Sequence, residues 1–277
     1  MRQVLITANE LADSLRSRQP PLVLDCRARL GDGDAGRRLW EAGHVPGSLH
    51  LDLDRDLAAA PGEGGRHPLP TPEAFTATLQ RLGVSPDLPV VVLDDMGGQL
   101  AAARAWWMLA VWAGHPDVRV LDGGLRAWQE AGGELLLERT ASPEPSRWQP
   151  TFDTDACMDA DRVFSGRELK VDARSEERFR GEAEPIDPVA GHIPGAVCRP
   201  SAANLDEAGR FKGAETLEAE LPRGDAIVAY CGSGVTACHN ILAYAIAGRP
   251  LPRLYPGSWS EWVRDPSRPV ARSTNRS

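Results

Sequence analysis

The feature that most constrains this chain is an internal repeat. Residues 43–48 (GHVPGS) recur as residues 191–196 (GHIPGA), and residues 23–27 (VLDCR) recur as residues 170–174 (KVDAR). The two pairs lie at nearly the same offset, 148 residues for the first and 147 for the second. Self-similarity at a fixed spacing indicates that one structural unit occurs twice.

Two further matches follow in the same order along the chain. Residues 90–94 (VVVLD) match residues 227–231 (IVAYC), and residues 121–128 (LDGGLRAW) match residues 255–262 (YPGSWSEW). Four ordered matches make chance a poor explanation. A chain of 277 residues is also longer than one hydrophobic core usually supports. The sequence therefore predicts a tandem duplication.

The boundary between the two halves is marked by proline. A polar stretch contains three prolines, which cannot donate a backbone hydrogen bond, so it is predicted to be a linker. The predicted domains are residues 1–140 and 155–277, and the predicted linker is residues 141–154. The three prolines are Pro143, Pro145 and Pro150.

Each half alternates strand-like and helix-like stretches. Residues 90–93 and 118–121 are short β-branched apolar runs typical of buried strands, whereas residues 101–112 have helical character. This alternation predicts an α/β fold of two domains, each a mostly parallel sheet with helices on both faces. Ligands of such sheets bind beyond the carboxyl ends of the strands. Cys231 directly follows the strand-like run 226–230.

Cys231 opens a loop that suits a reactive thiolate. Glycines in the sequence CGSGVT allow a close backbone approach, so that successive N–H groups can point inward as an anion-binding nest. The N-terminus of the following helix adds partial positive charge. Such a cradle favours the thiolate over the thiol. We therefore predict Cys231 as the nucleophile, Ser233 as a nearby hydroxyl, and Gly232, Gly234, Val235 and Thr236 as substrate-binding residues.

Composition excludes several other classes of protein. A net charge of -8 and a pI near 5.3 argue against a nucleic-acid partner. No apolar run approaches the roughly 18 residues of a membrane span, and Asn9, Glu10 and Asp13 interrupt the region where a signal peptide would be apolar. We therefore expect a cytoplasmic protein without a membrane partner. Five cysteines without a CxxC pair argue against zinc and against a disulfide framework.

Taken together, the motifs resemble the rhodanese superfamily. The repeated GHxPG element, the Cys231 loop and the closing GSWSEW at residues 257–262 are similar to those of its tandem-domain sulfurtransferases, and the resemblance covers nearly the whole chain. It implies a non-catalytic first domain, where Asp94 stands at the position of Cys231, and a catalytic second domain. The loop resembles that of 3-mercaptopyruvate sulfurtransferases, because thiosulfate-preferring relatives usually place basic side chains where Gly232 and Ser233 stand.

The resemblance also implies a donor-binding segment. Arg178 matches the arginine that would bind the donor carboxylate, for which a guanidinium is well shaped. Mercaptopyruvate enzymes tend to carry a second arginine after a Glu-Pro pair, but Ile186 stands there, which leaves Arg180 as the candidate substitute. Both halves repeat an Asp-x-Arg element, at residues 25–27 and 172–174, and we expect its arginine to serve structure as a buried ion pair.

A proton relay is implied in the same way. The family's proposed Asp, His and Ser match Asp54, His67 and Ser233, which could deliver a proton to the enolate that sulfur departure leaves. His44 and His192 have the same context in both halves although only one half is predicted to be active. These two histidines are therefore expected to bond backbone near the GHxPG turn rather than to take part in catalysis.

The resemblance implies an enzyme, a sulfurtransferase that carries sulfane sulfur as a persulfide on Cys231. The expected donor is 3-mercaptopyruvate, and the expected acceptors are a thiol, thioredoxin or cyanide. No cofactor or metal is expected, since the cysteine itself stores the transferred group. The alternatives are a thiosulfate:cyanide sulfurtransferase and a non-enzymatic sulfur-relay or binding module. A cysteine phosphatase is disfavoured, because Ala237 stands where its phosphate-binding arginine would lie.

Overall fold

The structure is a computed structural model that describes residues 3–138 and 140–272. The ends of the two predicted domains, residues 1–2 and 273–277, lie outside the described residues. The chain divides into two compact units, each of which includes a short segment from the opposite half of the sequence. The first unit comprises Met1–Ala59, Leu69–Asp153 and Asp206–Phe211, and the second comprises Ala60–Pro68, Thr154–Leu205 and Lys212–Ser277.

The first unit is built on a five-stranded sheet. Its strand order is β1-β5-β4-β2-β3, and every neighbouring pair is parallel. The strands are β1 (Leu5–Ile6), β2 (Leu22–Asp25), β3 (Leu49–His50), β4 (Val90–Leu93) and β5 (Val118–Leu121). The helices are α1 (Ala8–Leu15), α2 (Ala35–Glu41), α3 (Pro72–Arg81), α4 (Ala102–Trp106) with the π-helical segment η1 (Trp107–Trp112), and α5 (Gly124–Glu130).

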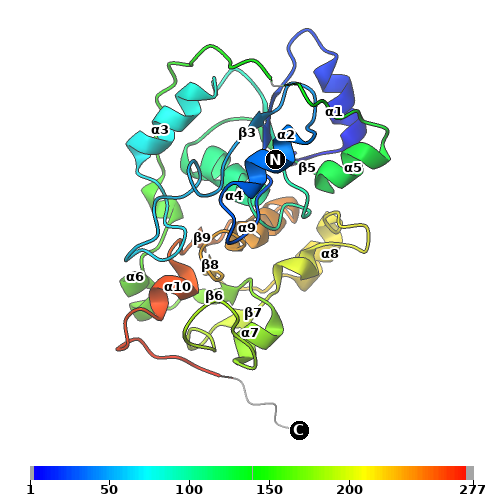
Figure 1. Cartoon of the computed structure of the whole chain (residues 1–277). Helices are drawn as coiled ribbons and strands as arrows, with labels where there is room; N and C mark the ends of the chain where they lie inside the picture. Colours follow the sequence, from blue (N-terminus) through cyan, green and yellow to red (C-terminus); the bar gives the residue numbers. More distant parts are fainter. Residues whose placement is uncertain (1–2, 139, 273–277) are drawn as a thin grey trace. The chain divides into compact units, whose positions relative to one another are not determined.

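Helices cover both faces of this sheet (Figure 1). On one face α1 and α5 pack against alternate strand residues, such as Val91 and Leu93 of β4, to form one apolar core. Helix α4 contacts β4 and β5. All four residues of β4 are buried, as expected for a central parallel strand with both faces covered.

The second unit repeats the plan with four strands. Its strand order is β7-β6-β8-β9, again with all pairs parallel. The strands are β6 (Leu169–Asp172), β7 (Val197–Cys198), β8 (Ile227–Tyr230) and β9 (Arg253–Leu254). The helices are α6 (Ala160–Ser165), α7 (Glu176–Arg180), α8 (Ala214–Glu220), α9 (Ala237–Ile246) and α10 (Ser258–Trp262), with 3-10 turns η2 (Thr154–Ala156) and η3 (Ser201–Asn204).

Helices pack on the sheet of the second unit around β8. Val228 and Tyr230 join α6 and α10 in a core that contains Trp259 and Trp262. Helix α9 contacts β8 and β9, and α8 packs against α9. Because parallel strands end at one edge of the sheet, β8 delivers the residue that follows it, Cys231, to the edge where α/β proteins bind ligands.

The structure confirms the duplicated α/β fold predicted from the repeat. Strands β2, β3, β4 and β5 correspond to β6, β7, β8 and β9, with the same parallel pairings. In the second unit the position equivalent to β1 is occupied only by a single parallel bridge between Cys157 and Leu254. The stretch 101–112 is not one continuous α-helix, since α4 gives way to the π-helical segment at Trp107.

Candidate active site

Cys231 is fixed at the carboxyl end of β8 by the start of α10. Its N–H donates to the Ser258 hydroxyl (3.1 Å), and its carbonyl accepts from the Trp259 N–H (3.0 Å). The next carbonyl, that of Gly232, accepts from the Ser260 N–H (2.9 Å). Ser258 has φ 54, the only positive φ among the non-glycine residues that the structure describes. The backbone is therefore strained at the serine whose hydroxyl binds the N–H of the candidate nucleophile.

Gly234 lets the loop turn tightly above the same element. Its φ is +76, and a Cβ at this position would lie 2.2 Å from the carbonyl oxygen of Pro256. A side chain here therefore meets both a strained backbone conformation and a backbone atom that cannot move aside cheaply. Glycine is the residue that this close approach requires.

The corresponding loop of the first unit shows what such a backbone binds. Asp94 follows β4 as Cys231 follows β8, and its carboxylate accepts from the N–H groups of Met96 (2.9 Å), Gly98 (2.8 Å) and Ala102 (3.2 Å). Asp94 is 2% exposed. Burial raises the pKa of this carboxyl above its usual value, although the three amide hydrogen bonds act to lower it. The fold thus places converging amide donors around the first residue after the strand.

In the second unit the residue at the matching position is Cys231, and the loop that follows it has N–H groups left over. Gly232, Ser233 and Val235 are buried, and in the described part of the chain their N–H groups have no protein acceptor. Buried amide groups almost always find a partner. The loop is therefore suited to an anion held beside Cys231, which is itself 2% exposed.

His67 and Ser233, two members of the predicted relay, lie together. The His67 Nδ1 and the Ser233 Oγ are 2.7 Å apart, and both residues belong to the second unit. Asp54, the third member, belongs to the first unit, where its N–H donates to the Asp52 carboxylate (2.9 Å). Thr236, predicted to bind substrate, is half-buried and precedes α9.

Two guanidinium groups flank the loop. A Cβ built at Gly232 would lie 2.8 Å from Arg66 Nη2 and 3.5 Å from each Nη of Arg178. Arg178, predicted from the resemblance, also pairs with Glu184 (2.7 Å) and Asp187 (3.1 Å). Arg66, which the sequence did not single out, pairs with the other oxygen of Asp187. The two cations are thus joined by one carboxylate.

Arg180 is placed differently from the expectation for it. Its guanidinium binds Glu176 (2.7 Å) and Glu182 (2.9 Å) on the surface of α7 and the turn that follows. The second cation beside Gly232 is therefore that of Arg66, and Ile186 contributes no charge.

The predicted Asp-x-Arg ion pairs are confirmed in both units. Arg174 binds Asp172 (2.7 Å) and the Gly191 carbonyl (2.7 Å), and it also reaches Glu184 (3.2 Å). Arg27 and Asp25 form the same buried pair in the first unit (2.7 Å). Because Glu184 also binds Arg178, the ion pair at the end of β6 is continuous with the charges beside the Cys231 loop.

Opposing effects set the ionisation of the carboxyl groups in this network. Burial raises the pKa of Glu184, but hydrogen bonds from Arg178 and backbone amides lower it overall. Burial dominates at Asp187 and raises its pKa, against the opposing attraction of Arg66.

The repeated histidines have the structural role expected for them. The Nδ1 of His44 lies 2.8 Å from the Trp40 carbonyl oxygen, and the Nδ1 of His192 lies 2.7 Å from the Phe179 carbonyl oxygen. Each imidazole also stacks on the aromatic ring of that same residue.

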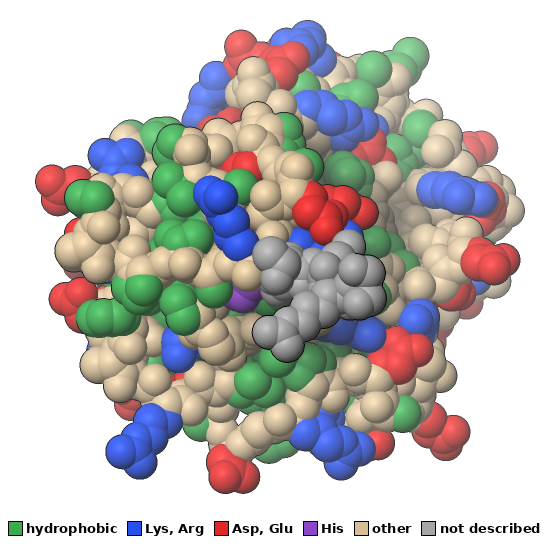
Figure 2. All heavy atoms as spheres, turned by 90° about the horizontal axis from the view of Figure 1, so that it is seen from below, with side chains coloured by type: hydrophobic (Ala, Val, Ile, Leu, Met, Phe, Trp, Pro, Cys, Tyr) green, Lys and Arg blue, Asp and Glu red, His purple; other side chains and the backbone are tan. Residues whose placement is uncertain are grey.

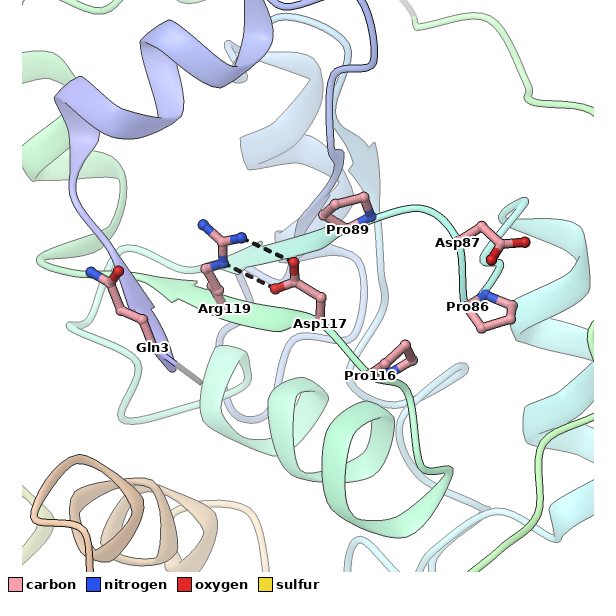
Figure 3. Close-up of a pocket in the computed structure, with 7 residues that line it drawn as sticks. All are labelled: Gln3, Pro86, Asp87, Pro89, Pro116, Asp117 and Arg119. Atoms are coloured by element: carbon pink, nitrogen blue, oxygen red, sulfur yellow. Dashed lines mark hydrogen bonds and ion pairs between the residues drawn. The ribbon is translucent and has the colours of Figure 1, made fainter. Parts of the chain in front are cut away.

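Other surfaces offer less chemistry. Figure 3 shows a hollow at the amino ends of β4 and β5, where the guanidinium of Arg119 is paired in two places with Asp117 (3.0 and 2.9 Å). Figure 2 shows basic and acidic side chains interspersed on the face that it presents. Within residues 3–138 and 140–272, no cluster of three or more His, Cys, Asp or Glu could hold a metal ion. No helix in these ranges is long and apolar enough to cross a membrane.

Comparison with known proteins places this geometry in a family. The model of the rhodanese-like domain matches residues 7–131 and again residues 160–265. The chain belongs to the rhodanese family, and it carries two such domains in tandem.

Individual relatives are similar to this chain over nearly its full length. A Pseudomonas aeruginosa protein named "Probable 3-mercaptopyruvate sulfurtransferase" is 50% identical over 96% of this chain and 97% of its own. A Mycobacterium tuberculosis protein named "Putative thiosulfate sulfurtransferase SseB" is 42% identical over 98% of each. The solved structure of the 3-mercaptopyruvate sulfurtransferase from Leishmania major is 31% identical, with a TM-score of 0.84, over 95% of this chain and 76% of that one.

Proposed function

We propose that this protein is a sulfurtransferase that moves sulfane sulfur from 3-mercaptopyruvate through a persulfide on Cys231. One observation carries the proposal. The buried residue Cys231 follows β8 and begins a loop in which the N–H groups of Gly232, Ser233 and Val235 have no protein acceptor among the described residues, and the guanidinium groups of Arg66 and Arg178 lie beside Gly232. This arrangement offers a nucleophile, a cradle for the sulfur that it receives, and cations for an anionic donor.

The first half-reaction transfers sulfur to the enzyme. The Cys231 thiolate attacks the donor sulfur, a new S–S bond forms, and the bond between that sulfur and C3 of the donor breaks. The electron pair of the broken bond stays on C3, which gives the enolate of pyruvate and leaves Cys231 as a persulfide. In this proposal the buried N–H groups of Gly232, Ser233 and Val235 stabilise negative charge on sulfur. The N–H groups of Met96 and Gly98, which match those of Ser233 and Val235, bind the Asp94 carboxylate in the first unit.

The enolate must then gain a proton at C3 to leave as pyruvate. The His67 Nδ1 and the Ser233 Oγ, 2.7 Å apart, supply an imidazole and a hydroxyl for that transfer. Asp54 completes the relay in this proposal.

The second half-reaction returns the thiolate. A small-molecule thiol, a thioredoxin-type protein or cyanide attacks the terminal sulfur of the persulfide. The S–S bond breaks, its electron pair stays on the Cys231 sulfur, and the acceptor leaves as a persulfide or as thiocyanate. No further redox partner is needed, because the electron pair that stays on C3 reduces the donor carbon while the transferred sulfur is oxidised from the thiol to the sulfane level.

Charge balance favours 3-mercaptopyruvate over thiosulfate as the donor. The positive charges of Arg66 and Arg178 are matched by the carboxylates of Asp187 and Glu184. A singly charged 2-oxo acid suits such a site better than a dianion, which would enter a locally neutral region of an acidic protein. Thiosulfate is the second candidate, because two guanidinium groups beside the loop could also bind its oxygen atoms.

Mass spectrometry of the intact protein tests the proposal. After a brief treatment with 3-mercaptopyruvate and no acceptor, the wild type is expected to gain the mass of one sulfur atom. Cys231→Ser should not gain it, whereas Cys238→Ser, which changes a buried cysteine in α9, should. A wild type that gains sulfur from neither 3-mercaptopyruvate nor thiosulfate would leave a non-enzymatic role, and a much larger kcat/KM with thiosulfate would reverse the order of the donors.

A further inference from the structure

We propose that Arg66 is a specificity-determining residue that binds the carboxylate of the sulfur donor together with Arg178. The inference rests on the proposed function and adds to it a residue from the first half of the sequence. It identifies the donor class as a 2-oxo acid with one negative charge, recognised by a pair of guanidinium groups and not by charges within the Cys231 loop.

The segment that carries Arg66 is seated on the element that holds the nucleophile. The Arg66 N–H donates to the Ser260 hydroxyl (3.1 Å). At the preceding residue, Gly65, a Cβ would lie 2.6 Å from that hydroxyl and 2.8 Å from the Gly257 carbonyl oxygen, so the backbones are in close contact. Since α10 also binds the backbone of Cys231, the arginine and the thiol are positioned by the same helix start.

The Arg66 side chain divides its donors between a carboxylate and the loop. Its Nη1 binds Asp187, and its Nη2 is the atom closest to a Cβ built at Gly232 (2.8 Å). The side chain of Asp187 is 3% exposed, whereas those of Arg66 and Arg178 are 30% and 17% exposed. A guanidinium has five N–H donors, so an arginine held by one carboxylate can still bind a second one that arrives from solvent.

The distances within the donor match this placement. In 3-mercaptopyruvate only one carbon separates the carboxylate from the carbon that carries sulfur, so the two ends must bind close together. Gly232, which both guanidinium groups flank, is the residue directly after Cys231. A donor whose sulfur faces the thiol therefore places its carboxylate within reach of Arg66 and Arg178.

Nearby alternatives are accounted for by their own contacts. Ile186 is 49% exposed and uncharged, and its N–H donates to Glu184 (3.1 Å). Arg180 is held by Glu176 and Glu182. Arg174 is buried against Asp172, with its side chain 1% exposed. Among the arginines of α7 and its surroundings, Arg178 is thus the one at the loop, and Arg66 provides its counterpart.

The test compares two donors that differ only at the carboxylate. Mercaptoacetone carries the same thiol and ketone as 3-mercaptopyruvate, with a methyl group in place of the carboxylate. For Arg66→Gln we expect kcat/KM with 3-mercaptopyruvate to fall about 10- to 100-fold, mostly through KM, because one charge-assisted contact is lost. With mercaptoacetone the change should stay within about threefold, since that donor never makes the contact.

Control variants separate binding from folding. Arg66→Lys keeps the charge but loses the fork, so it should recover part of the lost activity with 3-mercaptopyruvate. Arg180→Gln removes an arginine of the same region that is bound elsewhere and should not distinguish the donors. Equal losses with both donors in Arg66→Gln would indicate a structural role and overturn the inference, as would an unchanged kcat/KM. If the wild type itself forms no persulfide with 3-mercaptopyruvate, the proposed function fails and this inference fails with it.

Discussion

Substituting alanine for Gly234 should separate two costs that the Cys231 loop combines. The first is conformational, since the residue has φ +76, a region that costs an L-amino acid about 1–2 kcal/mol. The second is steric, since the new Cβ would lie 2.2 Å from the Pro256 carbonyl oxygen. Normal contact requires about 1 Å more than this, and forcing atoms apart inside a packed region costs about 1–3 kcal/mol.

Gly195 is the matched control for the conformational cost alone. It has φ +79, and a Cβ there would meet no atom within 4 Å. Gly195→Ala should therefore lower the free energy of unfolding by about 1–2 kcal/mol, whereas Gly234→Ala should lower it by about 2–5 kcal/mol. Urea denaturation followed by circular dichroism measures both values.

Persulfide formation should differ between Gly234→Ala and Gly195→Ala. Relief of the Gly234→Ala overlap must move Pro256, and with it the start of α10 that binds the Cys231 backbone. Persulfide formation should therefore be lost in Gly234→Ala and retained in Gly195→Ala. The reasoning is refuted if the two variants have the same stability within about 0.5 kcal/mol and Gly234→Ala still forms the persulfide.

Two further predictions concern acidic groups whose pKa is raised. Asp94→Ala leaves three amides without this acceptor, two of them buried, and should lower the free energy of unfolding by about 1–3 kcal/mol at pH 7. Asp95→Ala, which removes a surface ion pair, should lower it by at most about 1 kcal/mol. Burial raises the pKa of Asp94 in the folded state, so the stability that this residue contributes is complete below the pKa of the unfolded state and is lost as the pH rises through the folded-state pKa. The loss of stability in Asp94→Ala, measured by urea titration, should therefore be larger at pH 4 than at pH 7. A smaller loss at pH 4 would contradict this. Burial also raises the pKa of Cys198 to about 12, which leaves about one thiolate in 10,000 at pH 8. Peptide mapping after iodoacetamide treatment should therefore show that Cys198 is labelled roughly a thousandfold more slowly than an unperturbed thiol. Labelling at the rate of a free cysteine would disprove this prediction.

Local patterns predicted what local chemistry determines. The runs at 90–93 and 118–121 are strands β4 and β5 with the same bounds, because buried parallel strands are formed by short, mainly β-branched apolar runs. The Cys231 loop follows from a strand, two glycines and a helix that are contiguous in sequence. Helix α4 was predicted to be longer, since periodicity alone does not show where the hydrogen bonding shifts to the π-helical pattern.

Arg66 could not be found in this way, because its partners are distant in sequence. It pairs with Asp187 across 121 residues, and its segment 60–68 packs in the unit formed mainly by the second half. The stretch is rich in glycine and proline and has no hydrophobic period to fix its position. The signal that existed was a chemical one. A donor site with Ile186 in place of an arginine lacks a cation, and the unassigned arginine next to His67 was available to supply it.

The two loops show how one fold can hold either a carboxylate or a thiol directly after a central strand. Both present backbone N–H groups to the residue after a central strand, and the fold must satisfy those groups whether or not it performs chemistry. In the first unit Asp94 brings its own carboxylate oxygens and binds three of the amides permanently. A cysteine side chain is shorter and has one weak acceptor. The buried N–H groups of Gly232, Ser233 and Val235, which have no protein acceptor among the described residues, are therefore left to be satisfied by a further atom. The terminal sulfur of a persulfide is such an atom, and its binding is reversible because it can be transferred to an acceptor.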